Sequence, residues 1–211
     1  MELGLRERKK ARTRRAISEA AIALFLERGY DDVPVAEIAE AAEVSKRTLF
    51  AYFPTKDDLV LHRFADHEDE AARTVRDRAS GETPLGALHR HLRTELEERN
   101  PITGLCDTPE IVAFHRLVRE TPALTAALVR YHARGVAALE SALLGTTGDV
   151  PHRELTARLA ASQVTTALQE LANTNQRRIV GGRSAEELAP TALAEADHAF
   201  ELLGAGLRPY A

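Results

Sequence analysis

The sequence predicts an all-α protein in which a three-helix helix-turn-helix domain, residues 1–54, precedes a larger helical domain, residues 55–211. Apolar residues recur at spacings of three and four along most of the chain, which is the period of an amphipathic helix. At positions 83–84, 108–109 and 121–122 a threonine is followed by a proline. A capping hydroxyl before a first-turn proline is a common start for a helix. Together these signals predict about nine helices.

The first predicted helix runs from about Arg8 to Arg28 and buries one apolar stripe. Gly29 lies where the end of a helix favours a left-handed residue. The members of the stripe are Ile17, Ala20, Ala21, Leu24 and Phe25. We expect this helix to pack over the next two and to complete the three-helix module.

Two short helices joined by a tight turn are predicted between Val35 and Lys56. Ser45 has the side-chain oxygen that a helix N-cap needs, and Pro54 ends the second helix. The first turn of this second helix contains Lys46, Arg47 and Thr48. In a helix-turn-helix, such a turn enters the major groove and its side chains meet base edges and phosphates. The alternative is an ordinary helical hairpin with a basic cap.

Charge is distributed unevenly along the chain. The net charge is −4, but residues 1–15 alone carry +5, which leaves −9 on the remainder. A basic arm directly before a helix-turn-helix is typical of phosphate contact, whereas the acidic remainder is unsuited to DNA. The alternative is a solvated basic tail.

Two segments of the sequence resemble the TetR family of transcriptional regulators. They are I-x-x-A-A-x-x-L-F-x-x-x-G-Y from Ile17 to Tyr30 and I-A-E-A-A-x-V-S-x-x-T-L-F-x-Y-F-x-x-K-x-x-L from Ile38 to Leu59. The resemblance implies an all-α homodimer with an N-terminal DNA-binding domain and a C-terminal domain that binds a small-molecule inducer. The expected partners are therefore a double-stranded DNA operator, a small effector and a second copy of the chain.

The residues expected to contact DNA combine the helix-turn-helix positions with those that the resemblance implies: Arg12, Thr13, Arg15, Ser45, Lys46, Arg47, Thr48, Phe50, Tyr52 and Lys56. Three positions depart from the family pattern. Glu43 replaces the usual glycine of the turn, so either it accepts a strained backbone or the turn differs. Phe50 replaces a phosphate-binding tyrosine but can still contact a sugar or a thymine methyl group. Pro34 replaces a hydroxyl residue, which removes one backbone contact.

Six further helices are expected in the larger domain. We expect the segment 100–107 to be a loop or a short helix, and Pro190 to kink or restart the last helix. The predicted helices span about residues 55–78, 84–98, 109–119, 122–144, 151–180 and 184–207. By the resemblance, the first of them is the lever through which an effector moves the DNA-binding domain.

The last two helices are expected to form the dimer interface, because the resemblance implies a four-helix contact between two copies there. Small residues on both helices would allow close packing. The expected interface residues are Leu168, Leu171, Leu193, Ala196, Phe200 and Leu203. The alternative is that both stripes belong to the internal core.

A ligand pocket is expected among the helices of residues 59–180, with apolar walls and a few polar anchors. The candidates are Phe64, His67, Leu92, Phe114, Leu117, Leu128, Tyr131, His132, Gln163 and Asn173. For each of them, core packing or surface exposure is the alternative. The segment R-E-T-P-A-L, followed by A-L-V-R-Y-H, is similar to a TetR subgroup with an acyl-CoA-like ligand-binding domain.

The sequence argues against an enzyme. Motifs such as H-E-x-x-H, G-x-S-x-G or a phosphate-binding glycine loop are missing, so no catalytic residue and no cofactor is expected. No metal site is expected either, because His62 and His67, like His89 and His91, lack the i, i+4 spacing of a helical His pair. A single cysteine and the lack of a long apolar stretch predict a cytoplasmic protein with no membrane partner.

The function expected from these features is a DNA-binding regulator, most simply a repressor that a small, largely apolar effector releases from a palindromic operator. One alternative is a helical ligand-binding protein of the same fold that acts as an activator or without an inducer. Another is a ligand-binding protein whose basic arm contacts something other than DNA.

Overall fold

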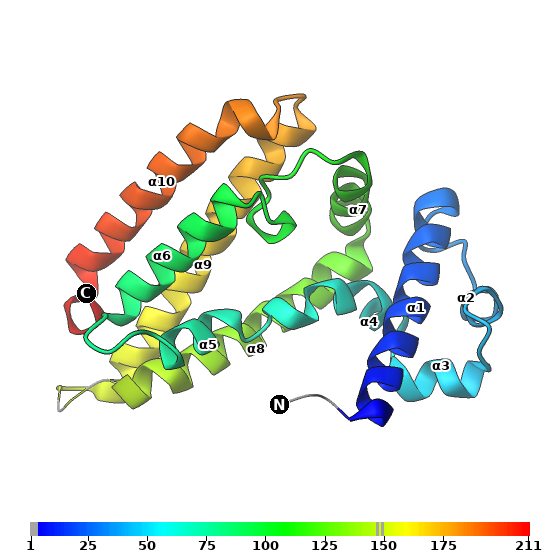
Figure 1. Ribbon diagram of the computed structural model, residues 1–211, viewed down its shortest axis with the longest axis horizontal. Coiled ribbons are helices and arrows are strands. Elements are labelled where there is room, and N and C mark those ends of the chain that lie inside the picture. The colour runs from blue at the N-terminus through cyan, green and yellow to red at the C-terminus, as the bar shows by residue number, and fades with distance from the viewer. Residues whose placement is uncertain (1–3, 147, 149) are drawn as a thin grey trace. The chain divides into compact units, whose positions relative to one another are not determined.

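The computed structural model describes residues 4–146, 148 and 150–211, and no β-strand occurs among these residues (Figure 1). The all-α fold class is therefore confirmed. The chain forms two compact units, one of Met1–Ala65 with Ala113–Val129 and one of Asp66–Val112 with Arg130–Ala211. The division into functional domains at residue 54 stays a prediction.

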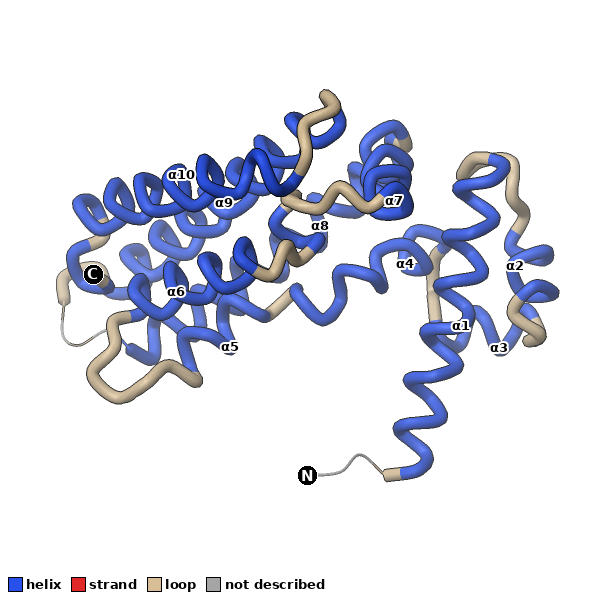
Figure 2. The backbone as a smooth tube through the Cα atoms, turned by 45° about the horizontal axis from the view of Figure 1, so that its top comes forward, coloured by secondary structure: helices blue, strands red, loops and turns tan. Residues whose placement is uncertain are grey.

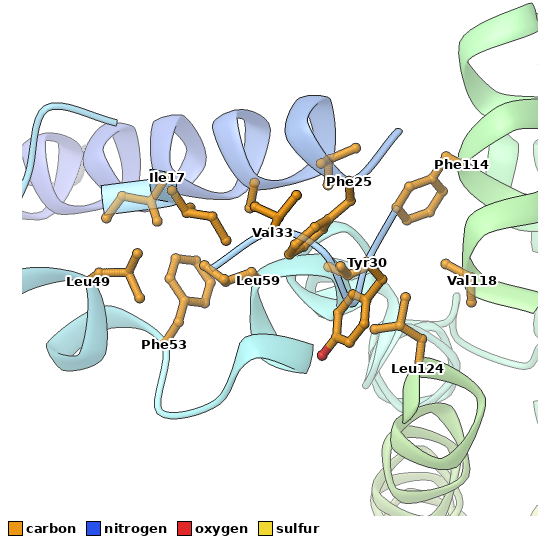
Figure 3. Packing of buried hydrophobic residues seen from close by; sticks show 14 of the residues in the cluster. Ile17, Phe25, Tyr30, Val33, Leu49, Phe53, Leu59, Phe114, Val118 and Leu124 are labelled. Atoms are coloured by element: carbon orange, nitrogen blue, oxygen red, sulfur yellow. The ribbon is translucent and has the colours of Figure 1, made fainter. Parts of the chain in front are cut away.

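The first unit contains the three-helix module and the first helix after it. Its helices are α1 (Leu5–Arg28), α2 (Val35–Ala41), α3 (Lys46–Tyr52) and α4 (Lys56–Leu61), together with parts of α7 (Pro109–Glu120) and α8 (Pro122–Thr146). Ile17, Phe25, Leu49, Phe53 and Leu59 are almost fully buried in one shared core. Figure 3 shows that Phe114, Val118 and Leu124 join this core from α7 and α8.

The second unit is built mainly from long helices. α10 packs against both α6 and α9, and α5 packs against α6 (Figures 1 and 2). The elements of this unit are α5 (Glu70–Arg76), α6 (Pro84–Glu97), the short 3₁₀ helix η2 (Pro101–Thr103), α9 (Arg153–Val180), α10 (Ala185–Gly206) and η3 (Arg208–Tyr210), together with the remaining parts of α7 and α8. None of the helices in the described part of the chain is long and apolar enough to cross a membrane.

One long predicted helix is interrupted. The sequence predicted a continuous helix over residues 55–78, but the structure has α4, then the 3₁₀ helix η1 (His62–His67), then α5. The interrupted stretch holds two aspartates and two histidines between residues 62 and 69, and these residue types support a helix less well than alanine or leucine. The sequence did not predict this break, because apolar residues recur at helical spacing both before and after it.

The restart predicted at Pro190 does not occur, because α10 is one uninterrupted helix. Its start is secured by a reciprocal capping box between Ser184 and Glu187. Leu188 and Ala192 are buried on either side of the proline, whereas Pro190 itself is exposed. Burial of the apolar face therefore holds the helix together across a residue that cannot donate a backbone hydrogen bond.

Candidate nucleic-acid interface

The N-terminal end of α3 is exposed and firmly capped. The Ser45 hydroxyl accepts a hydrogen bond from the Thr48 backbone amide at 3.0 Å, and the two hydroxyl oxygens are 2.8 Å apart. Lys46 and Arg47 follow the cap and are exposed, whereas Thr48 is half-buried. The helix thus begins at a defined point and presents two cations and a capped N-terminus, which suits an anionic partner.

Buried residues on the opposite side hold α3 in place. Leu49 is 1% exposed and Phe53 is fully buried, so one face of the helix belongs to the core. Phe50 is 48% exposed, and it lies three residues after Arg47 and four after Lys46. Residues at these spacings share a helix face, so the phenyl ring and the two cations form one outward surface.

The turn before α3 contains a strained residue. Glu43 has φ 54°, a left-handed conformation that glycine normally supplies. Its amide donates to the Glu40 carbonyl at 2.9 Å, and the Val44 amide donates to the Ala39 carbonyl at 2.9 Å. Of the two alternatives that the sequence left open, the structure shows the strained backbone.

Within the basic arm, the residues from Leu5 onward are helical. Residues 5–15 lie in the first half of α1, where Arg12 and Arg15 are exposed. The Thr13 hydroxyl donates to the Lys9 carbonyl at 3.0 Å, and the Arg14 guanidinium lies 5.2 Å from the centre of the Phe53 ring. Further along α1, the Ser18 hydroxyl donates to the Leu59 carbonyl at 2.6 Å and ties the helix to α4. The arm is therefore continuous with the part of α1 that packs on the helix-turn-helix.

Lys56 is oriented differently from the other candidates. Its ammonium group donates to the Tyr30 carbonyl and lies 4.4 Å from the Tyr30 ring centre and 5.3 Å from that of Phe25. Burial lowers the pKa of Lys56, against the opposing effect of Asp31 and other nearby carboxylates. Lys56 thus supports the packing of α1 against α4, and its predicted phosphate contact requires this side chain to turn outward.

The comparisons with known proteins agree with this geometry. The family profile described as "Bacterial regulatory proteins, tetR family" matches residues 17–62, which span α2, α3, α4 and most of the buried part of α1. Residues 17–62 thus form an N-terminal domain of the TetR family. This confirms the resemblance that the two sequence segments indicated.

Two curated relatives and one solved structure match longer parts of the chain. TcmR of Streptomyces glaucescens, described as a transcriptional regulator, is 36% identical over 128 residues, which cover 60% of this chain and 57% of TcmR. KstR of Mycolicibacterium smegmatis, a transcriptional repressor, is 32% identical over 109 residues, covering 48% of this chain and 50% of KstR. The chain thus spans about half the length of these curated relatives. NalD of Pseudomonas aeruginosa shares the fold, with TM-score 0.57 and 20% identity over 90% of this chain and 96% of NalD.

The predicted pocket residues are divided between the two units. Phe64, Phe114, Leu117 and Leu128 belong to the core of the first unit, where the rings of Phe64 and Phe114 lie 5.5 Å apart. The other six belong to the second unit: His67, Leu92, Tyr131, His132, Gln163 and Asn173. Of these, Tyr131 is buried, Gln163 and Asn173 are exposed, and the other three are half-buried. A shared pocket of these residues stays a prediction.

The predicted dimer residues differ in how far one chain already covers them. Ala196, Phe200 and Leu203 are buried in the core of the second unit, as the internal-core alternative expected. Leu168, Leu171 and Leu193 are half-buried and pack against the same cores. The large apolar side chains that α9 and α10 leave exposed among the described residues are Leu155, Leu159 and Leu202. The sequence did not predict Leu202 as an interface residue, because Leu202 lies one position away from the buried stripe.

Proposed function

We propose that the protein is a DNA-binding transcriptional regulator that acts as a repressor in its free, dimeric form. The observation that carries this proposal is the capped and exposed start of α3, with Lys46 and Arg47 beside Phe50. TcmR and KstR, which are described as a regulator and a repressor, support it at the level of the family. Such a protein acts in the cytoplasm, where it meets DNA.

In the proposed complex, α3 enters the major groove. The guanidinium of Arg47 is suited to a bidentate contact with a guanine edge, and the Phe50 ring to a thymine methyl group. Arg12 and Arg15, on the exposed half of α1, contribute phosphate contacts that depend on salt and not on sequence.

Dimerisation gives the proposed regulator its operator. Two copies related by a two-fold axis read two half-sites about 34–36 Å apart, or a multiple of this, so the operator is palindromic. A small, largely apolar effector then releases the DNA by binding more tightly to a state in which the two α3 helices no longer match the grooves.

The test begins with selection of bound fragments from random DNA, followed by measurement of affinity over a range of salt concentrations. Arg47→Ala is expected to cost about 1–3 kcal/mol on the selected operator and to relax its base preference at one position. The double variant Arg12→Ala/Arg15→Ala is expected to weaken all DNA alike and to flatten the dependence on salt. Arg208→Ala, an exposed arginine of the second unit, is the control.

The outcome that rejects the groove assignment is an unchanged operator affinity and base preference in Arg47→Ala. The proposed release is tested separately, by adding apolar metabolites to the wild-type complex. An effector that binds the free protein and the complex with equal affinity would contradict the proposed mechanism, because it shifts no equilibrium.

A further inference from the structure

Three metal-ligand side chains converge between α5 and α6 in the second unit. The two helices lie side by side (Figures 1 and 2). Glu70 comes from the first turn of α5, and His91 and Glu95 are four residues apart on α6, so they project from the same face. One ligand atom from each of these three residues lies within 4.8 Å of the other two.

The contacts within this cluster leave polar atoms unsatisfied. One oxygen of Glu70 is 2.8 Å from His67 Nδ1, a normal hydrogen bond. Its other oxygen is 3.5 Å from His91 Nε2, which is beyond ordinary hydrogen-bond length. His91 Nε2 and one oxygen of Glu95 are buried and have no hydrogen-bond partner among the described residues. Buried polar atoms of this kind are uncommon and call for a ligand or another explanation.

The charges in the cluster also favour a cation. Glu70 and Glu95 each place a carboxylate oxygen in the cluster, and these two oxygens lie within 4.8 Å of each other. Two carboxylates therefore approach each other in a partly buried site, where one positive ion between them would remove the repulsion.

We propose that Glu70, His91 and Glu95 bind one divalent transition-metal ion, with His67 orienting the Glu70 carboxylate. One imidazole and two carboxylates suit Zn²⁺ and its neighbours in the first transition row better than Mg²⁺ or Ca²⁺, which prefer oxygen ligands alone. Three protein ligands with water in the fourth position form a known type of zinc site.

The distance between two of the ligand atoms fits this proposal. An ion about 2.1 Å from each of two tetrahedrally arranged ligand atoms holds those atoms about 3.4 Å apart. The distance between the Glu70 oxygen and His91 Nε2 is 3.5 Å. The Glu95 ligand atom lies within 4.8 Å of the other two, a distance that rotation of its flexible side chain can shorten. The side chains of Glu70 and His91 are 23% and 30% exposed, so an ion can enter from solvent.

The site is tested by titrating the untagged full chain, freed of metal by a chelator, with Zn²⁺ in a calorimeter. We expect one equivalent to bind and the melting temperature to rise with the Zn²⁺ concentration. Glu95→Gln and His91→Gln are each expected to weaken binding at least tenfold. Glu97→Gln, an exposed glutamate on the same helix, is the matched control and should bind Zn²⁺ like the wild type.

Absence of a one-equivalent site, or Zn²⁺ affinity in Glu95→Gln within twofold of that in Glu97→Gln, would overturn the proposal in favour of an ion-pair cluster without metal. Circular dichroism establishes that each variant is folded. If the variants do not fold, the visible absorption spectrum of Co²⁺ added to the wild-type chain tests the site instead. A visible absorption band typical of four- or five-coordinate Co²⁺, displaced by one equivalent of Zn²⁺, supports the site, and an aqueous Co²⁺ spectrum rejects it.

Discussion

One residue of the first unit, Glu43, shows that the fold tolerates local backbone strain. Glu43 occupies the left-handed position of the turn, with φ 54°, although its side chain is exposed. A non-glycine residue in this conformation costs about 1–2 kcal/mol. The turn keeps its geometry because the Glu43 and Val44 amides both find carbonyl partners and because α2 and α3 are anchored in the core.

Replacing this residue by glycine should stabilise the protein. We expect Glu43→Gly to raise the free energy of unfolding by about 0.5–1 kcal/mol, because the relief of strain exceeds the added entropy of glycine in the unfolded chain. Glu40→Gly, at an exposed position inside α2, should instead lose about 1 kcal/mol. Urea denaturation of both variants checks the pair. Equal effects of the two substitutions would contradict the assigned conformation.

His115 should make the first unit sensitive to acid. Burial, with smaller effects of the Arg119 and Arg63 charges, lowers the pKa of His115 from 6.5 to about 4. In the unfolded chain His115 therefore becomes protonated below pH 6.5, whereas in the folded chain it stays neutral until about pH 4. Stability is intact above this window and falls within it as the pH decreases.

The expected slope is at most about 1.4 kcal/mol per pH unit for this one group. In His115→Gln the loss of stability between pH 6.5 and 4 should be smaller than in the wild type. His198→Gln, which changes an exposed histidine, should retain the wild-type profile. Denaturation midpoints measured at several pH values give the answer, and parallel curves for wild type and His115→Gln would show that His115 does not carry the effect.

At the scale of elements, helix ends follow local chemistry and helix interiors follow burial. Thr55 with Asp58 and Ser184 with Glu187 form capping boxes at the starts of α4 and α10. Pro190 lies inside α10 and removes one of its backbone hydrogen bonds, yet the helix continues because its apolar face is buried against α6 and α9. At this position, therefore, the local preference of proline is to end the helix, whereas the packing of α10 favours its continuation.

Pro190→Ala should stabilise the protein. We expect a gain of about 1–2 kcal/mol, since a hydrogen bond and a better helix former outweigh the greater freedom of the unfolded chain. Pro109→Ala should change stability little, because Pro109 is exposed at the first position of α7, where no intrahelical amide bond is lost. Thermal unfolding of the two variants compares them directly. A loss of stability in Pro190→Ala would mean that the proline relieves strain instead of causing it.

At the scale of the whole molecule, the proposed regulator needs a second copy of itself. Leu155 and Leu159, at the start of α9, and Leu202, near the end of α10, are each at least half exposed. Figure 1 shows these two helix ends at the same end of the second unit. Exposed apolar side chains at neighbouring helix ends are typical of an interface that a partner covers.

A charge at this place should separate the dimer. We expect Leu202→Arg to reduce the mass in sedimentation velocity from twice the 23.1 kDa of one chain to that of a single chain. Val129→Arg is the control, because Val129 is 66% exposed and Leu202 63%, but Val129 lies in the first unit. Retention of the dimer by Leu202→Arg would place the interface elsewhere.

Much of the candidate site was predictable because it depends on neighbours in the sequence. The Ser45 cap, the outward position of Lys46 and Arg47, and the burial of Leu49 follow from spacings within one or two turns of helix. The orientation of Lys56 was not predictable, because Tyr30 and Phe25 hold it from a helix and a loop more than twenty residues away in the sequence. The burial of Phe200 and Leu203 likewise depends on how α10 lies against other helices.

The sequence by itself determined that this chain is helical, where most helices begin, and which residues begin α3, because capping, periodicity and proline act locally. Only the tertiary structure decided that residues 62–69 interrupt a helix and that Glu70 meets His91 and Glu95. A search for paired histidines on one helix missed this cluster, since its ligands come from two helices and one of them is a lone histidine. Contacts between elements depend on packing across the whole core, which no short stretch of sequence contains.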